Sequence, residues 1–174
     1  GDRIDAGDAI LPGQAPDDDI VFAFGGDDTV LAGEGADTVY GQAGDDTIEG
    51  GDGDDLLFGD REVGSSTPED NGDDVIDGQD GDDRIFGDGG DDTLLGGEGE
   101  DTIDGGDGDD LIDGGADADI LSGGADRDTF VGVTAGDRID GGETFSVSPG
   151  DDLDTLDLTG AAEAENPGGS LQVT

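Results

Sequence analysis

Apolar side chains recur along this chain at every ninth residue, and each stands two residues after an aspartate. Glycines gather in the four positions that open each unit. The register breaks once, where a step of nineteen separates Asp55 from Asp74. Repetition at a fixed short period predicts a solenoid built from stacked units. The apolar positions are Val21, Val30, Val39, Ile48, Leu57, Ile76, Ile85, Leu94, Ile103, Ile112, Leu121, Phe130 and Ile139.

Each unit divides into a six-residue loop and a three-residue strand. Glycine turns sharply through positive φ without a Cβ clash, so the loop positions are suited to tight turns. In the strand the apolar eighth residue points inward while its two neighbours point outward. The pattern therefore predicts an all-β fold with a thin apolar interior. The broken step is one unit plus ten extra residues, 61–70, which we expect to form a surface insertion.

Composition alone gives a different picture. The 174 residues include 50 acidic and 5 basic side chains, for a net charge of −45, and only 30% are apolar. This is typical of a disordered acidic segment, which cannot bury enough apolar surface to offset its conformational entropy. The strict nine-residue register argues against disorder, provided that something neutralises the charge.

The charge also limits the partners. Phosphate groups repel the chain, so we expect neither nucleic acid nor an anionic membrane surface as a partner. No apolar run approaches the length of a membrane span, and without cysteine there is no disulfide or thiolate chemistry.

The unit reads G-G-x-G-x-D-x-U-x, where U is a large apolar residue. Its fullest copies are residues 50–58, 96–104 and 105–113. The repeat resembles the RTX (repeats-in-toxin, hemolysin-type) calcium-binding nonapeptide. The resemblance covers about residues 14–140. It implies a right-handed parallel β-roll with two nonapeptides per coil and about seven coils.

The resemblance also implies several calcium ions per chain, held between loops that stack two repeats apart. One edge would carry Asp19, Asp37, Asp55, Asp83, Asp101, Asp119 and, at its end, Asp137; the other would carry Asp28, Asp46, Asp74, Asp92, Asp110 and Asp128. Backbone carbonyls complete the implied ligand set: Gly50, Asp52, Gly78, Asp80, Gly87, Gly89, Gly96, Glu98, Gly105, Asp107, Gly114 and Ala116. Oxygen donors of this kind are what calcium takes, in sets of about six to eight.

The loops are unequal. Those ending at Asp119 and Asp128 have Asp117 and Asp126 at the fourth position, where most units have glycine. We expect aspartate to tolerate left-handed geometry there. The loops before Asp19 and Asp137 depart further from the pattern, and we expect them to bind calcium weakly or only to cap the roll. We expect the Asp74 loop to keep its ion.

The ends of the chain suggest further boundaries. Residues 1–13 read as a partial first repeat with an insertion, and 141–159 as a closing repeat with an insertion. Residues 160–174 read as a linker toward a missing downstream segment. The roll itself is expected over 14–140.

Two carboxylates about 5 Å apart repel by roughly 3 kcal/mol at an effective dielectric near 20. A column of aspartates should therefore not close without metal, and metal binding should supply the folding free energy. We expect an unfolded chain without calcium and a cooperatively folded chain with it.

Aromatic side chains occupy the ninth position of alternate units: Phe22, Tyr40, Phe58 and Phe86. Stacked coils would place them one above another on one sheet. Two interpretations stay open, a ladder that covers its own surface and a docking stripe for a neighbouring domain or a glycan.

Other functions fit less well. The chain has no histidine, cysteine or G-x-S-x-G motif, so we expect no enzyme here, although a catalytic domain elsewhere in the parent protein is compatible. No segment matches the EF-hand loop. Ice binding through outward threonine rows is a further alternative, with Thr29, Thr47, Thr93 and Thr129 beside the strands.

The resemblance implies a calcium-triggered folding module of a larger bacterial protein exported by type I secretion, and hence a secreted location. The alternative is a calcium-stiffened adhesive or spacer segment with its own binding face.

Overall fold

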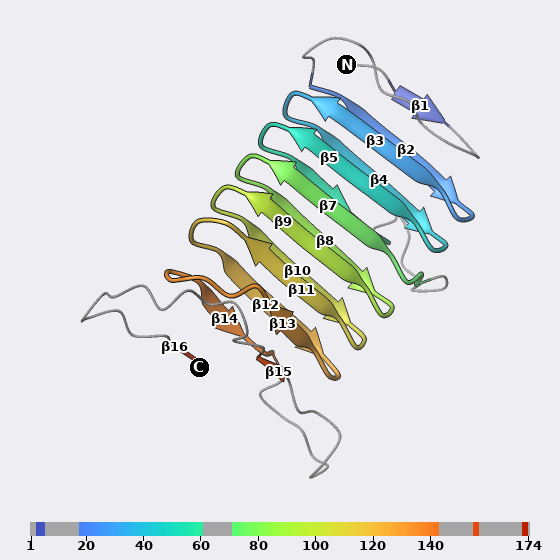
Figure 1. Ribbon diagram of the computed structural model, residues 1–174. Coiled ribbons are helices and arrows are strands. Elements are labelled where there is room, and N and C mark those ends of the chain that lie inside the picture. The colour runs from blue at the N-terminus through green and yellow to red at the C-terminus, as the bar shows by residue number, and fades with distance from the viewer. Residues whose placement is uncertain (1–2, 6–17, 61–70, 143–154, 157–171, 174) are drawn as a thin grey trace.

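The computed structural model describes residues 3–5, 18–60, 71–142, 155–156 and 172–173. Its regular elements are β-strands arranged in two parallel sheets (Figure 1). The nine-stranded sheet contains, in spatial order, β1 (Arg3–Asp5), β2 (Ile20–Gly25), β4 (Thr38–Ala43), β6 (Leu56–Phe58), β8 (Arg84–Gly89), β10 (Thr102–Asp107), β12 (Ile120–Ala125), β14 (Arg138–Asp140) and β16 (Gln172–Val173). The seven-stranded sheet contains β15 (Thr155–Leu156), β13 (Thr129–Val131), β11 (Leu111–Gly115), β9 (Thr93–Glu98), β7 (Val75–Asp80), β5 (Thr47–Asp52) and β3 (Thr29–Glu34).

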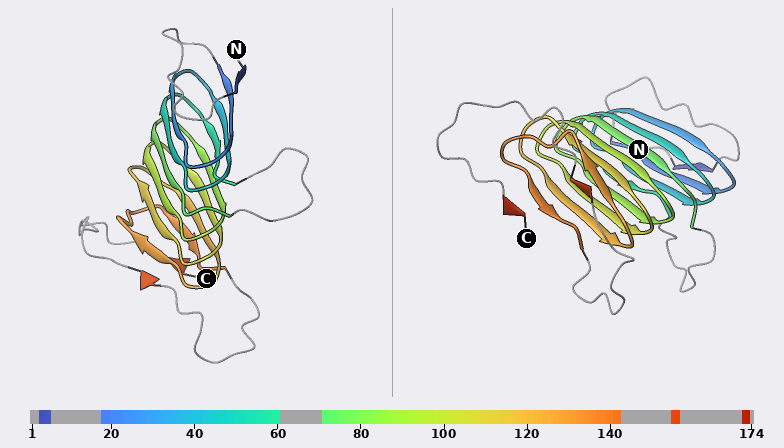
Figure 2. Two further views of the ribbon diagram at one scale, coloured as in Figure 1. Left: turned by 90° about the vertical axis from the view of Figure 1, so that its right-hand side faces the viewer. Right: turned by 60° about the horizontal axis from the view of Figure 1, so that its bottom comes forward.

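From β2 onward, successive strands alternate between the two sheets, so each turn of the chain contributes one strand to each. Between β2 and β14, strand partners lie eighteen residues apart away from the insertion, as in Thr102 opposite Ile120. Across the insertion the offset grows by ten, as in Leu56 opposite Arg84, and the register on both sides is kept. The turns stack as a solenoid of about six, close to the predicted seven. Figure 2 shows them as flattened rings piled along one axis. The all-β parallel roll with two repeats per turn is confirmed.

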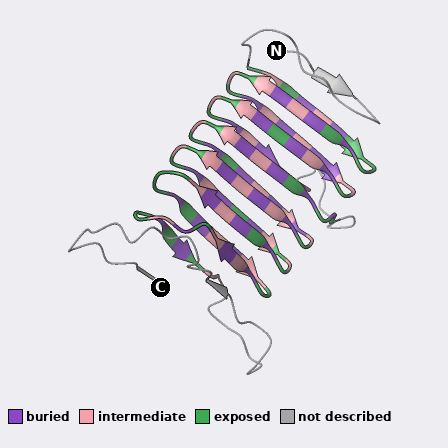
Figure 3. Ribbon diagram, viewed as in Figure 1, coloured by how far each residue is buried: buried purple, intermediate pink, exposed green. Residues whose placement is uncertain are grey.

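The interior is a double row of aliphatic side chains facing each other between the sheets. All thirteen apolar positions predicted from the register are buried, with exposed fractions between 0% and 6%. Burial alternates along each strand, as Figure 3 shows by colour. The alternation is buried–intermediate–buried along Val39, Tyr40 and Gly41 of β4, for example. This follows from the pleat, which points successive side chains to opposite faces.

The aromatic residues at the ninth position form a continuous stack on the outer face of the nine-stranded sheet. Phe22, Tyr40, Phe58 and Phe86 come from β2, β4, β6 and β8, which are neighbours in that sheet. Ring centroids in successive pairs lie 4.9, 5.0 and 5.1 Å apart, with interplanar angles of 6°, 8° and 15°. The predicted column is confirmed as a geometric feature.

Several predicted boundaries fall outside the described residues. These are most of the partial first repeat 1–13, the insertion 61–70, and most of the segments 141–159 and 160–174.

Candidate metal centre

The sixth-position aspartates form two columns, one along each edge of the roll where a loop leads into a strand. In each column the Oδ1 atom of one aspartate accepts a hydrogen bond from the backbone N–H of the aspartate one turn earlier. The eleven hydrogen bonds of this kind measure 2.7–3.2 Å between donor and acceptor. They link the same two series that the eighteen-residue spacing predicts, so the stacking of the columns is confirmed.

The second carboxylate oxygen, Oδ2, differs from Oδ1 in its hydrogen bonding. In the central loops it is buried and accepts no hydrogen bond from the chain. This holds for Asp37, Asp46, Asp55, Asp74, Asp83, Asp92, Asp101, Asp110 and Asp119. These residues are only 1–2% exposed. A buried charged oxygen without a partner costs the full desolvation free energy of that group. A column of such oxygens therefore indicates a missing cationic partner.

From Asp46 to Asp119, each of these Oδ2 atoms lies beside the first-position glycine of its own loop, whereas the first position before Asp37 is Ala32. A Cβ added to Gly50 would overlap Asp55 Oδ2 and would also approach the carbonyl oxygen of Gly78 in the next turn, at 2.8 Å. The same arrangement recurs at the first-position glycines Gly41, Gly59, Gly78, Gly87, Gly96 and Gly105. A carboxylate oxygen and a carbonyl oxygen from successive turns thus converge on one small space, which only glycine leaves open.

The carbonyls predicted as ligands fall into two groups. Those of Gly78, Gly87, Gly96, Gly105 and Gly114, at the first position, stand at this space. Those of Asp52, Asp80, Glu98 and Asp107, at the third position, accept a backbone N–H from the preceding turn at 2.6–2.9 Å and hold the loops together. For the carbonyls of Gly50, Gly89 and Ala116 the ligand role stays a prediction.

Sequence reasoning missed the carbonyls of the second and fourth positions. A Cβ added to Gly51 or Gly53 would overlap the carbonyl oxygen of Gly33 or Gly35 in the preceding turn, and the pattern repeats along the stack. A nine-residue spacing says which residues are glycine but does not fix the direction of their carbonyls. This direction needs the loop conformation itself.

Burial raises the pKa of the column aspartates well above the usual value. It opposes the N–H hydrogen bond that each accepts, and neighbouring carboxylates raise the pKa further. The pKa rises most at Asp74 and Asp110, which lie on the same edge. The resulting pKa values are about 6 for Asp46, Asp83, Asp101 and Asp119, about 7 for Asp55 and Asp92, about 8 for Asp110 and about 9 for Asp74. Without a cation, this array would take up protons.

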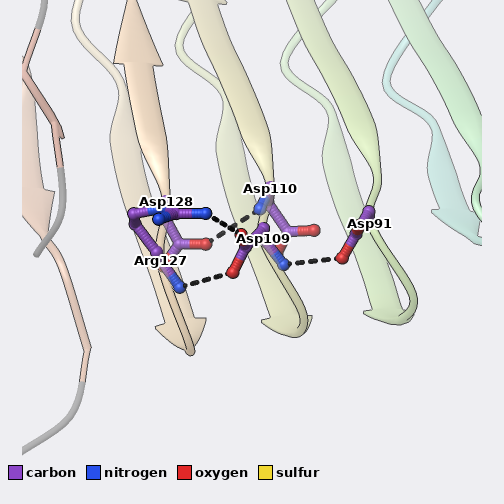
Figure 4. A network of polar contacts seen from close by, with 5 residues as sticks. All are labelled: Asp91, Asp109, Asp110, Arg127 and Asp128. Atoms are coloured by element: carbon purple, nitrogen blue, oxygen red, sulfur yellow. Dashed lines mark hydrogen bonds and ion pairs between the residues drawn. The ribbon is translucent and has the colours of Figure 1, made fainter. Parts of the chain in front are cut away.

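A second, exposed ladder runs along one edge through the fifth loop position. There the Oδ1 atom of each aspartate accepts the backbone N–H of the fifth residue one turn later. The series runs through Asp27, Asp45, Asp73, Asp91 and Asp109 and ends at Arg127. Figure 4 shows the Arg127 guanidinium reaching back to pair with the Asp109 carboxylate. Hydrogen bonds from the Arg127 N–H and guanidinium, together with its positive charge, lower the pKa of Asp109.

The last loop of the other edge differs from the rest. Thr134 donates its backbone N–H to Asp137 Oδ2 at 2.6 Å and its hydroxyl to Asp137 Oδ1 at 3.1 Å. Both carboxylate oxygens are therefore used by the chain itself. The loops before Asp119 and Asp128 keep the regular form, because Asp117 and Asp126 adopt the left-handed φ of the glycine they replace, at 71° and 73°. That expectation is confirmed.

The donor set fits calcium. It offers hard oxygens only, combining a buried carboxylate oxygen with carbonyl oxygens from adjacent turns. Within the described part of the chain no three carboxylates come close enough to share one ion. Each ion would therefore draw most of its ligands from the backbone and only one or two from aspartates.

A comparison with protein-family models finds the RTX calcium-binding nonapeptide repeat in four copies, over residues 16–39, 31–62, 70–103 and 95–130. No curated protein and no solved structure matched the chain. The matched segments cover more than half of the sequence and coincide with the stacked loops. The chain therefore belongs to the family of RTX calcium-binding nonapeptide repeats, whose arrays bind several calcium ions.

Proposed function

We propose that this roll is a calcium-triggered folding module of a larger secreted bacterial protein. The observation that carries the proposal is the column of buried Oδ2 atoms in the central loops, which accept no hydrogen bond from the chain and, from Asp46 to Asp110, lie near a carbonyl of the next turn. A fold with this many unneutralised buried oxygens is unstable alone. Calcium supplies the missing positive charge, so the metal-binding free energy becomes folding free energy.

The thin interior supports the same conclusion. Each turn contributes only two large apolar side chains to the core, and several of these are valines. A net charge of −45 opposes compaction throughout the chain. Apolar burial therefore leaves little surplus over conformational entropy, and the cation decides whether the chain folds.

An RTX roll of this kind is a structural calcium-binding module. We propose that any catalytic activity belongs to another domain of the parent protein, which would be the roll's main partner. The described residues contain no helix long and apolar enough to cross a membrane. Low intracellular calcium would keep the module unfolded during export, and extracellular calcium would fold it.

A calcium titration followed by far-ultraviolet circular dichroism and size-exclusion chromatography tests the proposal. We expect a disordered, expanded chain in excess chelator and a cooperative gain of strand signal with compaction as calcium rises. Magnesium serves as the control cation, because it demands octahedral geometry and gives up its waters reluctantly. Strand signal already present in excess chelator at neutral pH would overturn the proposal.

The second candidate is a calcium-stiffened segment with its own binding face, either adhesive or a spacer. It is favoured by the outer surface of β2, where Ile20 is 50% exposed and Phe24 is 41% exposed beside the aromatic column. Phe24 keeps a left-handed φ of 82°, a costly conformation for a bulky residue. Changing Tyr40 and Phe58 to Ser distinguishes the interpretations. A loss of stability alone indicates a structural ladder, whereas loss of binding to the parent's neighbouring domain or to a glycan indicates a docking stripe.

A further inference from the structure

The second position of the repeat holds a carboxylate in two successive turns, at Asp60 and Asp88. Strands β6 and β8 pair with Phe58 opposite Phe86, so these aspartates follow at equivalent places one turn apart. Both belong to the edge that carries Asp74 and Asp92. The other described loops have no acidic residue at this position, which is Phe24, Gly33, Gln42, Gly51, Gln79, Gly97, Gly106, Gly115, Gly124 or Val133.

The Asp60 carboxylate lies between two loops of that edge. Its Oδ1 accepts the backbone N–H of Gly72 at 3.1 Å, and the carboxylate also accepts the N–H of Gly89 in the next turn. Its Oδ2 is buried and accepts no hydrogen bond from the chain. The insertion thus leaves the roll next to a carboxylate that is held inside the loop stack.

Two further buried oxygens aim into the same region. Asp74 and Asp92 are 1% and 2% exposed, and neither Oδ2 has a hydrogen-bond partner in the structure. They lie against Gly59 and Gly87, the residues that immediately precede Asp60 and Asp88. The negative charge of Asp60 acts on both Asp74 and Asp92.

We propose that this pair of loops, 59–60 with 71–74 and 87–92, is the highest-affinity calcium site of the array. A cation binds more tightly where nearby carboxylates raise the local negative potential, even when they are not its ligands. Asp60 and Asp88 add two carboxylates to the two that any neighbouring pair of loops in a column supplies. They raise the negative potential around ions held by Asp74 and Asp92, and do not form a single four-carboxylate centre with them.

The proposal rests on calcium binding by the array, and it assigns an order to that binding. Calcium fills this pair of loops first. Because the ten-residue insertion separates Asp60 from Asn71, early binding here also fixes the two ends of the insertion. The turns before and after the insertion then share one register.

The test uses the double variant Asp60→Gln/Asp88→Gln. Glutamine already occupies the second position at Gln42 and Gln79, with φ of 83° and 79°, so the backbone accommodates it. The matched control Glu34→Gln/Asp104→Asn also removes two negative charges, from exposed positions that have no part in the predicted ligand set. Calcium binding to the full chain is measured by titration calorimetry and by competition with a chromophoric chelator. We expect the first binding step of the double variant to weaken by about tenfold or more, while the control changes little.

Terbium luminescence gives an independent readout. The chain has one tyrosine and no tryptophan, and Tyr40 stacks on Phe58, two residues before Asp60. Tyr40 directly precedes the loop 41–46, and Phe58 lies opposite it one turn later, so terbium emission excited through Tyr40 reports on ions at this end of the edge, up to the Asp60 loop, more than on ions in the later loops. We expect that emission to appear in the first binding step of the parent chain and to shift to higher terbium concentration in the double variant.

If the first calcium-binding step weakens equally in the double variant and in the control, the proposal is overturned, because the loss of net charge alone would then explain the effect. An unchanged first step in the double variant would also overturn it. If the double variant fails to fold at saturating calcium, the single Asp88→Gln variant is judged by the same two criteria. Failure of the proposed function is distinct, because the parent chain itself would then show no calcium-dependent folding.

Discussion

Two loops on the same edge, two turns apart, end at Asp101 and at Asp137. The sixth-position aspartate is hydrogen-bonded differently in the two loops. Asp101 is 1% exposed, and its Oδ1 accepts the N–H of Asp83 while its Oδ2 accepts no hydrogen bond. Asp137 is 6% exposed, and both of its oxygens accept hydrogen bonds from Thr134. The chain satisfies one carboxylate and leaves the other for a cation.

The glycine pattern of the loops accounts for this difference. In the Asp101 loop the second and fourth positions are Gly97 and Gly99, with φ of 119° and 136°. In the last loop these positions are Val133 and Ala135, neither of which has positive φ. The last loop follows another path and directs the Thr134 N–H at its own aspartate. Positive φ at these positions, whether from Gly or from residues such as Gln79 and Asp117, thus separates loops that leave Oδ2 without a hydrogen bond from the last loop, which satisfies its own aspartate.

Protonation is the other way to remove charge from the central oxygens, and it should give the largest effect. Burial in the folded chain raises the pKa of Asp55, Asp74 and Asp110 to about 7, 9 and 8, against 3.8 for an ordinary aspartate. The folded chain therefore binds more protons than the unfolded chain above about pH 4, and its stability falls as pH rises through these values. In excess chelator, lowering the pH from about 8 to about 5 should make the chain compact.

Circular dichroism and size-exclusion chromatography in chelator follow that transition. The calcium midpoint should also rise as pH falls, because protons compete with the metal for the same oxygens. A chelated chain that stays equally expanded across this range would contradict the assignment of buried, raised-pKa carboxylates to the central loops.

Much of this arrangement was predictable from the sequence. A nine-residue period fixes which residues face the interior, so Ile48, Ile76 and the other apolar positions were placed correctly. The same period fixes which aspartates share an edge. Both are consequences of strand alternation and of strict spacing, which one insertion interrupts without shifting the register on either side.

The directions of the loop carbonyls and the contacts of Asp60, Asp88 and Thr134 were not predictable in the same way. Asp60 and Asp88 look like two more acidic residues in a chain with 50 of them. The period places them on the edge of Asp74 and Asp92, but only the structure shows that the Asp60 carboxylate accepts the N–H groups of Gly72 and Gly89. The hydrogen bonds from Thr134 to Asp137 likewise depend on a loop path that no repeat dictates. The one signal that the sequence offered was the absence of both internal glycines from the loop before Asp137.

Filling the space beside a central aspartate should have the next largest effect. In Gly50→Ala the new Cβ would overlap Asp55 Oδ2 and press on the Gly78 carbonyl. We expect the calcium-bound chain to lose about 3 kcal/mol or more of unfolding free energy, as for other steric overpacking. Gly25→Ala is the control, because its Cβ meets nothing closer than 3.5 Å. Denaturant unfolding in saturating calcium measures both variants, and equal stability loss would contradict the geometry of the space.

Removing the charge of a single aspartate distinguishes a central loop, such as that of Asp101, from the last loop, that of Asp137. Asp101→Asn keeps an oxygen for the N–H of Asp83 but puts an amide where Oδ2 faces the cation. We expect its calcium midpoint to rise by about tenfold, equivalent to about 1.4 kcal/mol. Asp137→Asn should leave the midpoint nearly unchanged, because the chain already uses both oxygens. The comparison fails if the two variants shift the midpoint equally in parallel calcium titrations.

The smallest effect should come from Thr134→Val, which removes a hydroxyl but keeps the backbone N–H that binds Asp137 Oδ2. The variant loses the hydroxyl's hydrogen bonds to Asp137 Oδ1 and to the carbonyl of Asp117, which lies one turn earlier. We expect the last turn to lose about 1 kcal/mol of local stability, with no change in the calcium midpoint of the array. Amide hydrogen exchange at Arg138, whose N–H binds the carbonyl of Asp119, measures that loss. A rise in the calcium midpoint as large as that of Asp101→Asn would mean that Asp137 is a calcium ligand. Thr134 would then orient a metal-bound carboxylate and would not cap a free one.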